Sequence, residues 1–187
     1  MNRSRISILN PDPQKVVIDA AARTAAFFVR VLPALVDKRL LNELKIYSEI
    51  HDHCNVRICL HEGPDADHHD MVALERRGRY YRPHKHLRKG DTFHLLEGRL
   101  GIFSFDDTGI VIDAVVIGPG EIYRTAVNTY HAVLPLTDYV IHHENKPGPF
   151  ERSGDSVFPD WAPDGSDADA VMTYLETLAT RLPGETA

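Results

Sequence analysis

The sequence predicts a mainly β fold, a barrel or sandwich of short strands with helices at both ends. Two observations carry this prediction. Between residues 55 and 144, short segments with strand-like patterns alternate with turn signals such as Gly118-Pro119-Gly120. Before and after this block, residues 13–31, 37–47 and 167–182 place apolar side chains at helical spacing.

The first fifty residues are expected to form a helical extension. Asp12-Pro13 is typical of a helix start, and the first predicted helix runs from Pro13 to Val31, before Pro33. Its apolar stripe would consist of Val17, Ala21, Thr24, Phe28 and Val31. Asp37 is the predicted N-cap of a second helix, and both helices are expected to cover a sheet or a subunit contact.

Nine strands are predicted in the central block, because short runs with strand-like patterns follow one another at close spacing. They span residues 55–60, 71–77, 80–86, 92–96, 99–105, 110–117, 122–127, 131–136 and 139–144. Gly109 ends the turn that begins at Asp106, and it is expected to adopt the left-handed conformation.

After Glu144 the chain becomes rich in Pro, Gly, Asp and Ser, and Trp161 is expected to anchor this tail on the barrel. A final helix is predicted over residues 167–182, with Ser166 or Asp167 as its cap. The chain is therefore expected to have three parts. These are an N-terminal helical extension at 1–50, a β-barrel at 51–150, and a C-terminal tail and helix at 151–187 that pack on the barrel.

The composition is that of an ordinary soluble protein. The 187 residues are 43% apolar and 26% charged, and a net charge of −6 gives no electrostatic case for binding nucleic acid. The apolar segment 20–36 is interrupted by charged residues and a proline, so neither a signal peptide nor a membrane span is expected. Cys54 and Cys59 lack a CxxC spacing and, beside eleven histidines, favour a reducing cytoplasm over a disulfide framework.

A pair of histidines is the strongest chemical signal in the chain. His84 and His86 are two positions apart, so on a strand both imidazoles point to the same face. Asp91 follows on the next segment, and His131 is the best candidate for a third imidazole. Imidazoles with one carboxylate suit a divalent transition metal (Fe, Mn, Ni, Co or Zn) and leave positions open for water or substrate.

The spacing of this segment resembles the first motif of the cupin superfamily. The motif residues are Gly78, His84, His86, Asp91 and Gly98, and the family usually has glutamate at the position of Asp91. The resemblance implies a double-stranded β-helix, or jelly-roll barrel, with the metal in the barrel mouth. Aspartate is shorter by one methylene, about 1.5 Å, so Asp91 either ligates from a closer strand or acts through water, which leaves a three-histidine site.

The second cupin motif is similar to residues 126–131. His131 is kept, the usual proline is lost, and Asn128 stands where glycine is expected. Asparagine is the non-glycine residue best suited to a left-handed turn, so the turn is expected to survive. The resemblance therefore implies His84, His86, Asp91 and His131 as the metal ligands.

The sequence is more closely similar to the WbuC-type cupin metalloproteins, found near polysaccharide gene clusters. The similarity covers residues 36–164 and includes Asn55–His61, Arg82–His86, Asp91–Phe93, Phe105–Gly109, Glu144–Phe150 and Trp161–Pro163. The usual cupin arrangement implies a homodimer, and the expected partner is a small-molecule substrate rather than nucleic acid or a membrane. The terminal helices lie outside the similarity.

Further residues around the expected pocket are candidates for substrate chemistry. Candidate catalytic acids or bases are Tyr81, Tyr123 and Glu144, and candidate substrate-binding residues are Arg57, His61, Arg82, Lys85 and Lys146. The two tyrosines could equally fill the barrel. Arg57 could equally form a structural ion pair with Glu144.

The remaining histidines are expected to lie outside the site. His94 has the opposite strand parity to Asp91, so it should point away from the barrel interior. Only one of His142 and His143 can face inward, and the sequence does not choose between them. Four histidines in or near loops are expected to be exposed, namely His51, His53, His68 and His69.

Three functions fit these residues. The first is a metal-dependent isomerase, epimerase or lyase acting on a sugar or nucleotide sugar in polysaccharide metabolism, and an Fe(II)-dependent dioxygenase is its variant. The second is a non-catalytic module that senses a metal or small ligand. The third is a structural or storage-like cupin, which would not need the metal ligands.

Overall fold

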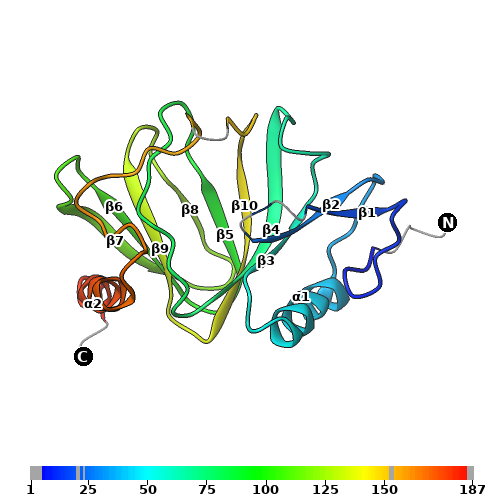
Figure 1. The fold of residues 1–187 in the computed structure, drawn as a ribbon, viewed down its shortest axis with the longest axis horizontal. Helices are drawn as coiled ribbons and strands as arrows, with labels where there is room; N and C mark the ends of the chain where they lie inside the picture. The colour runs from blue at the N-terminus through cyan, green and yellow to red at the C-terminus, as the bar shows by residue number, and fades with distance from the viewer. Residues whose placement is uncertain (1–5, 20–21, 23, 152–153, 185–187) are drawn as a thin grey trace.

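The computed structural model describes residues 6–19, 22, 24–151 and 154–184. These residues form ten β-strands and two α-helices (Figure 1). The elements are β1 (Val16–Asp19), β2 (Ala25–Val29), α1 (Lys38–Ile50), β3 (Val56–Cys59), β4 (His68–Arg76), β5 (Thr92–Glu97), β6 (Leu100–Phe105), β7 (Val111–Ile117), β8 (Ile122–Arg124), β9 (Tyr130–Pro135), β10 (Tyr139–Pro147) and α2 (Ala168–Ala179).

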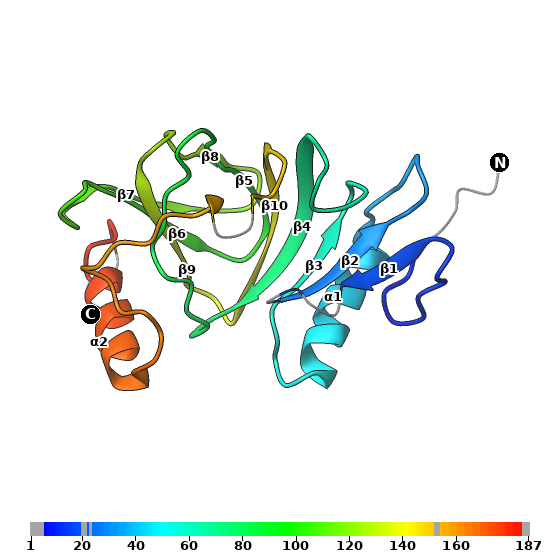
Figure 2. The ribbon, with the colours of Figure 1, turned by 45° about the horizontal axis from the view of Figure 1, so that its top comes forward.

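Two sheets make the barrel, with strand orders β1-β2-β3-β4-β10-β5-β8 and β7-β6-β9. Figure 2 shows β6, β7 and β9 curling across from β5 and β10. Between them lies an apolar core that includes Phe93, Leu95, Ile102 and Val140. The mainly β jelly-roll architecture expected from the sequence is therefore the one observed, and its strand bounds match within a few residues over most of the central block.

The predicted helix over residues 13–31 is wrong. Residues 16–19 and 25–29 form an antiparallel strand pair with Val16 opposite Val29, and β2 then pairs in parallel with β3. These segments are rich in β-branched and aromatic residues, which favour strands once a neighbouring sheet edge supplies backbone partners. The helical spacing of Val17 and Phe28 was coincidental, and Ala21 of the expected stripe lies outside the described residues.

Both remaining helices begin at their predicted caps. The Asp37 carboxylate accepts a hydrogen bond from the backbone N–H of Leu40 at 3.0 Å, and the Asp167 carboxylate accepts from Asp169 and Ala170. The buried side chains of α1 join a core with β1–β4, whereas those of α2 pack against β6 and β9. Figure 1 shows the two helices at opposite ends of the molecule.

The predicted strand over residues 80–86 is also wrong. The described structure has only isolated bridges there, from His84 to His131 and from Lys85 to Val157. Pro83 lacks a backbone N–H and so prevents a continuous ladder. His84 and His86 nevertheless keep the extended spacing that places their side chains on one side. The predicted strand 122–127 ends early, at Arg124.

The expectations for Gly109 and Trp161 agree with the structure. Gly109 has a φ of +91°, and the Trp161 ring packs against Phe105 and Tyr130 on the barrel wall. Both cysteines are free. Within the described ranges, none of the helices has the length and apolar character needed to cross a membrane.

Candidate metal centre

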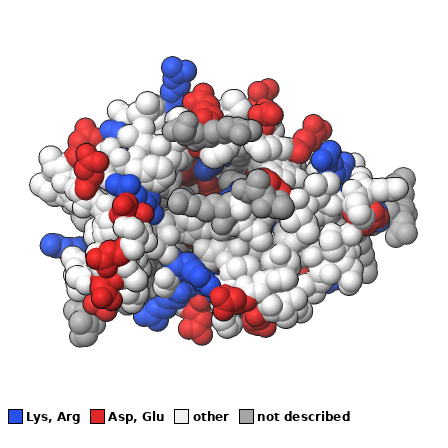
Figure 3. All heavy atoms as spheres, in the orientation of Figure 1, with Lys and Arg blue, Asp and Glu red and all other residues white. Residues whose placement is uncertain are grey.

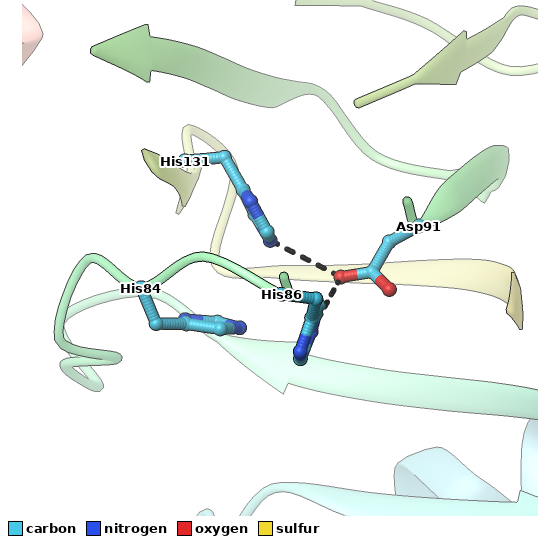
Figure 4. A group of neighbouring side chains, drawn as sticks. All are labelled: His84, His86, Asp91 and His131. Carbon is cyan, nitrogen blue, oxygen red and sulfur yellow. Dashed lines mark hydrogen bonds and ion pairs between the residues drawn. The ribbon is translucent and has the colours of Figure 1, made fainter. Parts of the chain in front are cut away.

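Four side chains converge at one point inside the barrel (Figure 4). Each of His84, His86, Asp91 and His131 offers a ligand atom, and these atoms all lie within 4.8 Å of one another. The Asp91 Oδ2 atom lies 3.1 Å from His131 Nε2 and 3.3 Å from His86 Nε2. The side chain of Asp91 thus reaches the histidines directly, despite being one methylene shorter than glutamate.

Backbone contacts hold the ligand segments together. The N–H of His84 donates to the carbonyl of His131 at 3.1 Å, and the N–H of His131 donates back at 2.9 Å. The N–H of Asp91 donates to the Thr125 hydroxyl at 2.8 Å. Asn128 has a φ of 56° and donates its N–H to the His86 carbonyl at 2.8 Å, so asparagine does preserve the turn before β9.

The hydrogen bonds of the three imidazoles fix which nitrogen faces the centre. Nδ1 of His84 contacts the Arg82 carbonyl at 3.1 Å, and Nδ1 of His131 contacts the Thr129 carbonyl at 3.2 Å. Nδ1 of His86 contacts the carbonyl of Asp155. Because carbonyl oxygens only accept, each Nδ1 carries a proton, so Nε2 is the nitrogen of each ring that can offer a lone pair to the centre.

The donor set fits a divalent transition metal. His131 and His86 direct their Nε2 atoms at the Asp91 carboxylate, and a cation bound between these groups could be held by all three. Across the described chain, His86 Nε2 and Asp91 Oδ1 are buried without a hydrogen-bond partner. Three imidazole nitrogens and one carboxylate oxygen are the ligand types that such ions prefer.

The protonation states suit metal binding. Burial, with the neighbouring imidazoles of His131 and His86, lowers the pKa of His84 to about 3, so His84 is neutral. Burial disfavours the Asp91 carboxylate, but its contacts with His131, His86 and the Lys146 ammonium outweigh it and hold the pKa of Asp91 well below its usual value. Asp91 is therefore an anion at neutral pH.

A cavity of about 700 Å³ adjoins the cluster, a size typical of small-ligand sites. Figure 3 shows this face of the molecule hollowed near its middle, with acidic and basic atoms visible inside. Three of the four candidate ligands line the cavity, namely His84, Asp91 and His131. The predicted substrate or catalytic residues that line it are Arg57, His61, Tyr81, Arg82, Glu144 and Lys146.

A buried ion pair lies beside the ligands. The Lys146 Nζ atom is 2.9 Å from Glu144 Oε1 and 3.6 Å from Asp91 Oδ1. Burial disfavours the lysine cation, but the two carboxylates outweigh it and raise the pKa of Lys146 above its usual value. Glu144 is thus paired with Lys146, whereas Arg57 donates from Nη1 to the Thr24 hydroxyl at 3.1 Å.

Lys85 and Tyr123 are placed away from the cavity. Lys85 lies between two inward-pointing histidines, so its side chain points outward, to Asp107 at 2.7 Å and over the ring of Tyr130. The Tyr123 hydroxyl donates to Asp113 at 2.7 Å. Tyr123 also packs against the barrel core that includes Phe93, so Tyr81 is the cavity-lining tyrosine of the predicted pair.

Tyr81 and Arg82 meet the cavity from the segment before the histidines. The Tyr81 hydroxyl accepts a hydrogen bond from Asn55 Nδ2 at 2.8 Å, and burial raises its pKa, so it stays protonated. Arg82 donates to the carbonyl of Pro159, and its guanidinium lies 5.6 Å from the centroid of the Phe158 ring. Arg82 therefore joins the cavity to the C-terminal tail.

His142 and His143 differ clearly in burial. His142 is fully buried, against the Phe93 ring and Glu75, whereas His143 is half-buried and contacts Asp70. The inward-facing member of that pair is therefore His142.

His69 was expected to be exposed, and that expectation is wrong. It is 5% exposed, it stacks on His61 with ring centroids 4.4 Å apart, and its Nε2 contacts the Pro64 carbonyl. The strand β4 begins three residues earlier than predicted, and this carries His69 out of the loop and into the sheet.

Sequence reasoning missed the contribution of the tail. Phe150, Ser156 and Phe158 line the cavity, and buried Asp155 forms an ion pair with Lys89 next to His86. No spacing rule connects these residues with the histidine motif, because they lie about seventy positions later in the chain. Only the folded chain brings them together.

Comparisons with known proteins give one family description and a set of distant structural likenesses. Residues 36–117, less than half of the chain, match a family model described as a domain of unknown function (DUF6016). No curated protein matches the sequence.

Solved structures with a similar fold have low identity to this chain. An uncharacterized conserved protein with a double-stranded β-helix domain from Klebsiella pneumoniae is 17% identical, with a TM-score of 0.43 over 57% of this chain and 80% of that one. A cupin superfamily protein from Desulfitobacterium hafniense is 10% identical, with a TM-score of 0.41 over 50% and 76%. An oxalate oxidase is 14% identical, with a TM-score of 0.43 over 60% and 64%. At this level of similarity no activity passes from those proteins to this one.

Proposed function

We propose that the protein is an enzyme that holds one divalent transition metal at His84, His86, Asp91 and His131 and acts on a small polar or anionic substrate. The observation that carries the proposal is the convergence of three imidazole nitrogens and one carboxylate beside a cavity of about 700 Å³. A metal bound there would supply Lewis acidity to a substrate oxygen.

Residues of the chain beside the ligands can move a proton. Glu144 lines the cavity, and its carboxylate lies 2.9 Å from the Lys146 ammonium, so a carboxylate base and a cation stand together. Tyr81 adds a protonated hydroxyl to the same cavity. Proton transfer to and from carbon is the step shared by isomerases, epimerases and lyases, so we assign the reaction to that class.

Two guanidinium groups support an anionic substrate. Arg57 and Arg82 line the cavity, and the Nε atom of each is buried without a hydrogen-bond partner among the described residues. Guanidinium groups bind carboxylates and phosphates through paired hydrogen bonds. The resemblance to WbuC-type proteins supports a sugar or nucleotide sugar in polysaccharide metabolism. An Fe(II)-dependent dioxygenase and a non-catalytic sensor remain the competing outcomes of the tests.

Metal analysis tests the shared premise. Protein purified without added metal should contain one transition-metal ion per chain, and His84→Ala and His131→Ala should lose it. His94→Ala is the matched control, since His94 has the opposite parity on β5 and is absent from the converging set. Metal-free wild-type protein that also fails to bind added Mn²⁺, Fe²⁺, Co²⁺, Ni²⁺ or Zn²⁺ would refute the metal site.

A proton-exchange assay separates an enzyme from a sensor. Candidate sugars and sugar nucleotides are incubated with the metal-loaded protein in D₂O, and deuterium incorporation at carbon is followed by NMR. The wild-type protein should catalyse exchange, and Glu144→Gln should lose it while keeping its metal. Saturable sugar binding with no exchange or conversion would favour the sensor, and oxygen consumption with Fe²⁺ would favour the dioxygenase.

A further inference from the structure

The C-terminal tail, residues 154–159, lies directly on the segment that carries the histidines. Lys85 and Val157 exchange backbone hydrogen bonds of 3.0 and 2.9 Å. On the other side of this segment, His84 pairs with His131 of β9. Figure 2 shows the tail, in orange, running from α2 over the barrel toward β10. The ligand segment is therefore held between a barrel strand and the tail.

Asp155 is the buried contact between the tail and the ligands. It is 3% exposed, its backbone carbonyl accepts from Nδ1 of His86, and its Oδ2 atom lies 3.5 Å from the same nitrogen. Its Oδ1 atom is paired with Lys89 and accepts from the backbone N–H of Glu151 at 3.3 Å. The Lys89 ammonium also donates to the Pro149 carbonyl at 2.8 Å. The carboxylate thus anchors the carbonyl that contacts His86.

His86 differs from His84 and His131 in where the carbonyl that accepts from its Nδ1 lies in the chain. The carbonyls that accept from His84 and His131 belong to Arg82 and Thr129, each two residues earlier in the same segment. The carbonyl that accepts from His86 lies 69 residues later, in the tail. An acceptor on the outer nitrogen of a metal-binding histidine fixes its tautomer and ring orientation. The tautomer and ring orientation of His86 therefore depend on a distant segment.

We infer that Asp155 is a positioning residue of the metal centre and that the tail completes the site by orienting His86. The inference rests on the metal site of the proposed function and not on the reaction. The carboxylate of Asp155 acts twice: it anchors its own carbonyl through Lys89 and Glu151, and it places a negative charge beside the His86 ring.

Binding of Co²⁺ alone tests the inference, because affinity and geometry can both be read from its visible absorption. Metal-free wild-type protein, Asp155→Ala, Asp155→Asn, Asp155→Glu and Asp160→Ala are titrated in competition with a chelator. Asp155→Ala should weaken Co²⁺ binding by about tenfold or more and should shift the visible bands. Asp155→Glu, which keeps the charge, should recover part of the affinity. Asp160→Ala is the control, because Asp160 is an exposed carboxylate that directly follows this tail.

Two results would overturn the inference. One is a Co²⁺ affinity and spectrum of Asp155→Ala that equal those of the wild type. The other is a lower unfolding temperature of metal-free Asp155→Ala with an unchanged Co²⁺ affinity, which would make Asp155 a purely structural residue. If Asp155→Ala does not fold, Asp155→Asn gives the same comparison, because it keeps the size of the side chain. Failure of the wild type to bind Co²⁺ or the other transition metals would instead refute the metal site itself.

Discussion

The backbone N–H of Asn128 donates to the carbonyl of His86 at 2.8 Å while Asn128 holds a φ of 56°. A left-handed residue in the turn before β9 is therefore tied directly to a metal-ligand candidate. The same turn leads into His131, so one backbone conformation sets the spacing of two imidazoles. Residues that adopt positive φ easily should support this turn, and branched residues should oppose it.

Substitution of Asn128 is the first prediction. Asn128→Val should destabilise the protein by about 1–2 kcal/mol, since a β-branched residue is strained at positive φ. Asn128→Gly should be within a few tenths of a kcal/mol of the wild type or slightly more stable. Urea denaturation measures both values, and equal stabilities of the two variants would contradict the role of the turn.

Removal of metal is the second prediction. An ion that binds only the folded state stabilises it by an amount that grows with concentration, about 2.7 kcal/mol at one hundred times the dissociation constant. Excess chelator should therefore lower the thermal unfolding midpoint of the wild type, and added Co²⁺ or Zn²⁺ should restore it. His131→Ala should lose most of this response, whereas His94→Ala should keep it.

Two glycines with nearly equal φ give the third prediction. Gly109 and Gly120 have φ values of +91° and +90°, but only at Gly109 would an added Cβ meet another group, the Trp161 ring at 2.7 Å. Gly120→Ala should cost only the strain of positive φ, about 1–2 kcal/mol. Gly109→Ala should cost more and should loosen the tail that Trp161 anchors. Chemical denaturation compares them, and equal losses would show that the ring contact contributes nothing.

The strand pair β1–β2 gives the fourth prediction. Phe27 and Ile18 face each other in register, but Phe27 is 0% exposed and Ile18 is 47% exposed. Phe27→Ala should destabilise the whole protein by about 3–5 kcal/mol, whereas Ile18→Ala should cost about 1 kcal/mol or less. A small effect of Phe27→Ala on the global unfolding transition would mean that these strands are a separable extension.

The pH dependence of stability gives the fifth prediction. Nε2 of His142 lies 3.7 Å from Glu75 in a fully buried position. Burial lowers the pKa of His142, but Glu75 outweighs it, so the folded-state pKa lies above the usual 6.5. The stabilisation is therefore complete below about pH 6.5 and is lost as the pH rises through the raised value.

Glu75→Gln should lower the pKa of His142 and remove this part of the pH dependence. Imidazole titration by NMR measures the pKa, and urea denaturation at several pH values measures the stability. An unchanged imidazole pKa in Glu75→Gln would contradict the assignment to this pair.

In an extended chain, side chains two residues apart point to the same side, and this rule predicted the parts of the site that lie on extended backbone. His84 and His86 share a side because they are two residues apart, and Lys85 points away for the same reason. The rule holds although residues 80–86 do not form a continuous strand, because local extension alone sets the direction of the side chains. The sequence could not decide whether Asp91 reaches the histidines directly, since this depends on the distance between two segments of the chain.

Predictions from the sequence failed where contacts with distant segments determine the local structure or the role of a residue. Residues 16–29 carry apolar side chains that fit either a helix or a strand, and the edge of β3 selects the strand by pairing with β2. Asp155 gives no local signal either, because its importance comes from Lys89 and His86, more than sixty residues earlier. Both cases are tertiary effects that local patterns cannot contain.

The bridge between Lys85 and Val157 has a consequence for biosynthesis. The chain is made from its N-terminus, so all four ligand candidates leave the ribosome before the tail that holds them. During that interval His86 lacks its outer hydrogen-bond partner, and the segment around it has β9 on one side only. A nascent or prematurely terminated chain that ends before residue 155 would carry all four ligand candidates but would lack the carbonyl that contacts Nδ1 of His86.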